Sequence, residues 1–106
     1  MAWVYLVFAG LLEIVWAVAM KHSHGFTRLV PTVIMVVGMI GSFWLLALSM
    51  RALPLGTAYT IWTGIGAVGA FVIGIAFLGE LASPLRLLAA GLIVTGLVLM
   101  KVSTPA

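Results

Sequence analysis

Four long apolar segments set what this chain can fold into. They cover residues 2–20, 29–49, 57–78 and 84–101. An α-helix needs about 20 mostly apolar residues to cross the hydrocarbon core of a bilayer, and each segment meets that length. Of the 106 residues, 65% are hydrophobic and only 7% are charged, whereas a soluble domain carries about 25% charged residues. The sequence therefore predicts an all-α membrane protein, with residues 1–106 forming a single domain of four transmembrane helices.

The breaks between these segments have local causes. Residues 21–28 form the most polar stretch of the chain, and residues 51–56 combine a Pro with a Gly, a pair that interrupts helices. Ser83 and Pro84 predict a capping residue followed by the first helical position. Because all three connections are short, neighbouring helices are expected to be antiparallel.

The positive charges give little preference for one orientation. Both termini fall on one side, which holds Arg51 and Lys101, and the other side holds Lys21, Arg28 and Arg86. The side with more Lys and Arg residues usually becomes cytoplasmic. Here one side has two such residues and the other has three. We therefore predict dual topology, with insertion in both directions. The alternative is one fixed orientation.

The small size of the chain favours a dimer. Many transporters achieve alternating access with two inverted repeats around a site near the membrane midplane. Four helices are too few to supply both repeats, whereas two copies in opposite orientations would supply them. We predict an antiparallel homodimer.

Glu13 is the one acidic residue inside an expected span. A charge at the bilayer centre costs about 2.5–3.5 kcal/mol on insertion scales. Either a proton or a cationic substrate can neutralise this carboxylate, and competition between them at one site would make the chain a proton-coupled exchanger of cations. The alternative is a structural Glu, protonated and hydrogen-bonded to a neighbouring helix.

Several residues are candidates to share the site with Glu13. On the first helix, Gly10 and Ala17 flank Glu13 and are expected to leave room beside it. Trp16, one turn on, forms a wall of that space or is a lipid-facing anchor. Ser42 either packs the second helix, bonds its own backbone, or bonds Glu13 or a substrate. Tyr59 and Trp62 share one face of the third helix, although an interfacial aromatic belt is the alternative.

Small residues mark two further features. Gly64 and Gly66 weaken the third helix and could form a hinge, or else allow close packing. Gly91, Thr95 and Gly96 give the fourth helix small residues of the kind that support helix association, and this helix has no ionisable residue in its middle. We assign these three residues to the dimer contact.

The chain lacks the residues that other functional classes require. The chain contains no Cys, no phosphate-binding loop and no nucleophile triad, so neither an enzyme nor a cofactor is expected. His22 and His24 are most simply solvated loop residues, and no metal site is predicted. The basic residues stand singly between apolar runs, which does not suit nucleic acid binding.

Taken together, the motifs resemble the small multidrug resistance family over essentially the whole chain, in its guanidinium-exporting branch. The resemblance lies in residues 9–17 (AGLLEIVWA), 21–28 (KHSHGFTR), 53–59 (LPLGTAY) and 61–69 (IWTGIGAVG). Trp16, one turn after Glu13, is typical of that branch. Phe43 and Trp44 are more like the drug-exporting branch, and Thr60 stands where a small apolar residue is more usual, which leaves the breadth of substrates open.

This resemblance implies an antiparallel dimer in the bacterial inner membrane, with the fourth helices in contact. It also implies export of guanidinium in exchange for protons. Glu13 would bind proton or substrate, and Trp16, Ser42, Tyr59 and Trp62 would line or order the site.

Three other functions remain open. The nearest is export of hydrophobic quaternary ammonium compounds by the same mechanism. A proton-ring subunit of a rotary ATPase also has a buried carboxylate, but it usually lies in the second helix of a two-helix hairpin. The third is a structural membrane protein without transport.

Overall fold

The computed structural model describes residues 1–104, which form four helices. Helix α1 runs over Ala2–His22, α2 over Leu29–Ser49, α3 over Leu55–Phe77 and α4 over Pro84–Ser103. All four are long and apolar enough to cross a membrane, which confirms the expected all-helical membrane fold. The last two residues of the expected domain, 105–106, lie outside the described part.

The helix ends differ from the expected ones by up to two residues, most instructively at α3. This helix begins at Leu55, two residues earlier than expected, because Pro54 stands directly before its first turn with an extended backbone. The first turn leaves backbone N–H groups without helical partners, so a Pro, which has no N–H, is accepted directly before it. At α4, Ser83 caps the helix as predicted and accepts a hydrogen bond from the Arg86 backbone N–H at 3.2 Å.

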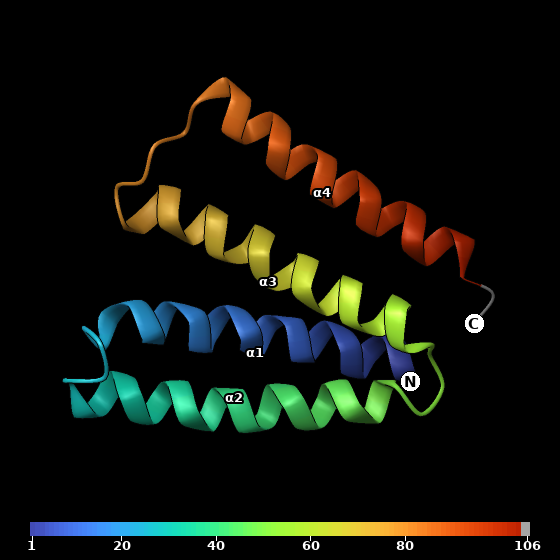
Figure 1. Cartoon of the computed structure of the whole chain (residues 1–106), viewed down its shortest axis with the longest axis horizontal. Coiled ribbons are helices and arrows are strands. Elements are labelled where there is room, and N and C mark those ends of the chain that lie inside the picture. The colour runs from blue at the N-terminus through green and yellow to red at the C-terminus, as the bar shows by residue number, and fades with distance from the viewer. Residues whose placement is uncertain (105–106) are drawn as a thin grey trace.

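The helices lie side by side in the order α4, α3, α1, α2, and both termini lie at the same end of the molecule (Figure 1). The molecule measures 43 × 34 × 16 Å. The shortest dimension is less than half of the others, so the helices form a flat layer. Helix α1 packs against both α2 and α3, which also touch each other, whereas α4 contacts α3.

The buried core lies among α1, α2 and α3. Within residues 1–104, α4 contributes no buried residue. The principal cluster of buried apolar side chains consists of Leu6, Ala9, Leu46, Leu53, Ala58, Ile61 and Trp62.

Candidate functional site

Glu13 lies in the middle of α1 and turns its side chain toward α3. It is half-buried, and its Oε1 atom is fully buried without a hydrogen-bond partner among residues 1–104. The carboxyl group packs directly on the backbone of Gly66, where a Cβ atom would overlap it. A glycine at this position therefore makes the space that the carboxyl group occupies.

Ser42 joins the three inner helices by hydrogen bonds. It is fully buried on α2. Its Oγ donates to the backbone carbonyl of Ala9 on α1 at 2.6 Å and accepts from the indole Nε1 of Trp62 on α3 at 2.9 Å. Of the expected roles of Ser42, the structure therefore gives neither a bond to Glu13 nor one to its own backbone, since the hydroxyl proton goes to Ala9.

Four aromatic rings form a row across α1, α2 and α3. Ring centroids are 6.2 Å apart between Trp16 and Phe43, 5.8 Å between Phe43 and Trp62, and 5.5 Å between Trp62 and Tyr59. Trp62 is buried, whereas 47% of Phe43 and 53% of Tyr59 is exposed. The row therefore opens onto the surface of the helix layer.

Trp16 carries a second buried polar atom without a partner in the described part of the chain. It follows Glu13 by three residues on α1, so the two side chains share a face of the helix. Its indole Nε1 is buried and has no hydrogen-bond partner among residues 1–104. An indole N–H only donates, so it suits an acceptor such as a carboxylate oxygen rather than a cation.

Comparison with known proteins shows the family of the chain. Residues 1–95 match the profile of the family described as Small Multidrug Resistance protein. The chain belongs to the small multidrug resistance family. It is 58% identical over 104 residues to proteins named "Guanidinium exporter" from Citrobacter freundii and Salmonella typhimurium, and 59% identical to one from Escherichia coli (strain K12). These matches cover 98% of this chain and 99% of each relative.

The space expected beside Glu13 is partly filled in this small multidrug resistance protein. A Cβ atom at Gly10 would lie 2.6 Å from the Ile65 side chain of α3. The expectation that Gly10 leaves room is therefore wrong in the single chain, because α3 packs into that gap. In the sequence Ile65 stands between Gly64 and Gly66, and this position was the available sign that α3 could pack closely against α1 there.

The glycines proposed as a hinge both serve close contacts. Gly66 receives Glu13, and Gly64 receives Leu97 of α4, with a Cβ atom at either position overlapping its neighbour. Helix α3 runs without a break through both positions. Close packing therefore accounts for both glycines in this conformation, and a hinge stays a prediction.

The residues assigned to the dimer contact separate into two groups. Gly91, Thr95 and Gly96 are all exposed, and nothing in the described residues lies within 4 Å of a Cβ atom built at Gly91 or Gly96. Gly96 lines the groove between α3 and α4. Gly91 and Thr95 are one turn apart and lie on the outer face of α4.

Two contributors were missed by sequence reasoning. Phe43 was considered only as a marker of substrate type, yet its ring links Trp16 to Trp62. Its position in the sequence, directly after the candidate residue Ser42, was the available sign of a place near the site. The Ala9 carbonyl was not expected to bond Ser42, because a backbone acceptor carries no signature in the sequence.

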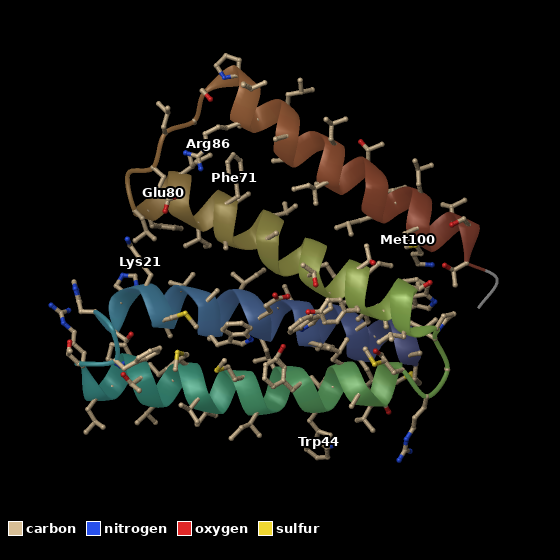
Figure 2. All side chains as sticks on the ribbon, viewed as in Figure 1. Lys21, Trp44, Phe71, Glu80, Arg86 and Met100 are labelled. Atoms are coloured by element: carbon tan, nitrogen blue, oxygen red, sulfur yellow. The ribbon has the colours of Figure 1, made fainter. Side chains whose placement is uncertain are left out.

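The one acidic residue outside this site lies in the connection between α3 and α4. Glu80 and Arg86 form an ion pair at 3.8 Å, with both side chains about half exposed, and Figure 2 shows them at the same end of the molecule as Lys21. Within residues 1–104, no three His, Cys, Asp or Glu side chains come together as metal ligands would. The absence of a metal stays a prediction.

Proposed function

We propose that this protein is a proton-coupled antiporter that exports guanidinium, with Glu13 as the shared binding group. The observation that carries the proposal is the buried Glu13 Oε1 atom, which has no hydrogen-bond partner in the part of the chain that the structure describes. The relatives named "Guanidinium exporter" support the choice of substrate.

The chemistry of the site suits this ion. Guanidinium is planar and cationic, and its N–H groups form a fork that matches the two oxygens of a carboxylate. Aromatic rings attract cations by about 0.5–2 kcal/mol each. Trp16, Tyr59 and Trp62 would line the site with their ring faces. Ser42 would act by holding Trp62 in place, since its hydroxyl group bonds both Trp62 and Ala9.

Competition at one carboxylate is sufficient for coupling. A proton and guanidinium both neutralise Glu13, and neither can bind its oxygens while the other does. A carrier that crosses between its two states only when Glu13 is neutralised would then exchange one ion for the other. The bend required between the states would fall at Gly64 and Gly66, where α3 has no side chains.

We propose that the working unit is an antiparallel, dual-topology homodimer in the bacterial inner membrane. A layer only 16 Å thick supports this, because one chain cannot enclose a site on both sides. The near balance of positive charges supports insertion in both directions. The outer face of α4 would then contact the second copy through Gly91 and Thr95, with Gly96 beside them, and each protomer would contribute one four-helix domain. No cofactor and no nucleic acid take part.

The alternative substrate is a hydrophobic quaternary ammonium ion. Phe43 favours this substrate, because its half-exposed ring adds aromatic surface between Trp16 and Trp62. Such an ion offers no N–H donors, so it would use the rings and the charge of Glu13 but not the carboxylate fork.

Exchange in proteoliposomes tests the proposal. An imposed proton gradient should drive uptake of labelled guanidinium in preference to tetraphenylphosphonium. Glu13→Gln should lower this exchange by about 100-fold or more, because it removes the charge that the cation pairs with. Glu80→Gln, which changes the other acid of the chain, serves as the matched control and should leave the rate unchanged. Preference for tetraphenylphosphonium would select the alternative, and coupled exchange by Glu13→Gln would overturn both.

A further inference from the structure

A second feature of the molecule, separate from the Glu13 site, is an apolar groove along the C-terminal half of α1. Its volume is about 520 Å³. Its floor is formed by α1 side chains between Ile14 and His22, and Ile34 of α2 and Ile73 of α3 also line it. His22 is the single polar residue of the lining and lies at the end of the groove.

The groove lies away from the proposed transport site. Successive residues of an α-helix are about 100° apart. His22 is nine residues after Glu13, so the two point in opposite directions from α1, and Val15 is also on the side away from Glu13. A second copy placed against the Glu13 side would leave this groove facing lipid.

The length of the groove, and its position along the membrane normal, match one leaflet of a bilayer. Eight residues separate Ile14 from His22, which corresponds to about 12 Å along the helix. Half of the hydrocarbon core is about 15 Å thick. Ile14 lies near the middle of α1 and His22 is its last residue, so the groove runs from close to the bilayer midplane to the interface.

The interfacial end of the groove is cationic. Lys21 precedes His22, and Arg28 stands directly before α2. Glu80 is at the same end, but it is paired with Arg86. The described residues 1–104 contain no ion pair to Lys21 or Arg28. The His22 Nδ1 atom donates to the Val18 carbonyl at 3.0 Å, which fixes the ring at the mouth of the groove.

We propose that this groove binds one acyl chain of an anionic phospholipid, whose phosphate lies against the Lys21 amine. An apolar groove accepts the tail of any lipid, but unpaired basic side chains at its mouth favour an anionic headgroup. The smaller groove that ends at Lys101 lacks this feature, because the Lys101 amine lies 4.7 Å from the centre of the Trp3 ring.

Native mass spectrometry of the full chain tests the assignment. Phosphatidylglycerol and phosphatidylcholine with identical tails are titrated separately, and the apparent Kd of the tightest bound lipid is measured. We expect phosphatidylglycerol to bind about fivefold more tightly per basic contact. Lys21→Gln should remove that preference, and Val18→Phe, which fills the groove, should weaken both lipids. Arg51→Gln, at the opposite end of the molecule, is the control and should change neither.

Two results would overturn the proposal. One is equal binding of the two lipids by the unaltered chain. The other is unchanged phosphatidylglycerol binding by Val18→Phe, because the tail would then lie elsewhere. Guanidinium exchange by each variant reports on folding, since neither Lys21 nor Val18 belongs to the proposed transport machinery. A lipid result of either kind leaves the Glu13 proposal untouched.

Discussion

Helices α1, α2 and α3 bury side chains against one another, whereas α4 buries none within the described residues. The inner three helices meet through Gly10, Gly38 and Gly66 and through the hydrogen bonds of Ser42. Helix α4 lies along the edge and touches α3 through residues such as Leu97. Both parts come from one chain of nearly uniform hydrophobicity.

The difference shows what holds helices together in lipid. Apolar side chains gain little by leaving a solvent of hydrocarbon, so association depends on close packing of small residues and on hydrogen bonds between helices. The inner helices have both, and the site is built where they meet. Helix α4 has small residues as well, but on its outer face the Thr95 hydroxyl bonds only the Gly91 carbonyl of the same helix, and no neighbour in residues 1–104 lies within 4 Å of a Cβ atom at Gly91. We therefore expect substitutions in the inner helices to act within the protomer, and substitutions on the outer face of α4 to act on the contact with a second copy.

Among substitutions that change helix packing, the largest effect is expected at Gly66 of α3. Gly66→Ala places a Cβ atom where the Glu13 carboxyl group lies, so the carboxyl group must move. Displacement of a binding group by about 1 Å can cost about 100-fold in rate, and we expect a loss of guanidinium exchange between about 10-fold and 100-fold. Gly56→Ala is the control on the same helix, because nothing in residues 1–104 lies within 4 Å of its new Cβ atom. Exchange at the original rate by Gly66→Ala would show that the contact does not matter.

Ser42 should give the next largest effect, through the free energy of unfolding. Ser42→Ala leaves the buried Trp62 N–H without its partner, which costs about 1–3 kcal/mol. Ser49→Ala is the matched control, since Ser49 is equally buried on α2 but donates only to the Leu46 carbonyl of its own helix at 2.6 Å. Equilibrium unfolding in mixed micelles measures both. Equal losses for the two variants would mean that the bonds between helices add nothing.

The smallest change within a protomer is expected on α4. In Gly91→Leu the new Cβ atom has no neighbour within 4 Å in residues 1–104 and Gly91 is exposed, so unfolding of the protomer should be unchanged. If two copies meet through this face, the dimer should dissociate about tenfold more readily, which corresponds to about 1.4 kcal/mol. Gly56→Leu adds the same side chain at another exposed glycine and should not affect the dimer. Energy transfer between labelled copies in liposomes measures the dimer fraction, and no difference between the variants would place the contact elsewhere.

The sequence was sufficient to predict the four helices, because length and hydropathy decide them locally. The N-cap at Ser83 followed from local chemistry for the same reason. The partners of Ser42 and Gly10 could not be predicted, since they depend on how α1, α2 and α3 rotate against one another. In a chain that is apolar on every side, periodicity gives weak guidance to that rotation. Glu13 stood out because it is the exception to this uniformity, while Phe43 did not, since one more aromatic residue among apolar ones carries little signal.

The central claim is that a proton and guanidinium take turns on the Glu13 carboxylate. Proton release on guanidinium binding measures this directly, in weakly buffered protein reconstituted in lipid nanodiscs and across a series of pH values. We predict that guanidinium releases protons at every pH at which Glu13 is protonated beforehand, and that Glu13→Gln releases none. Binding of guanidinium without proton release at every pH, or unchanged release by Glu13→Gln, would contradict it.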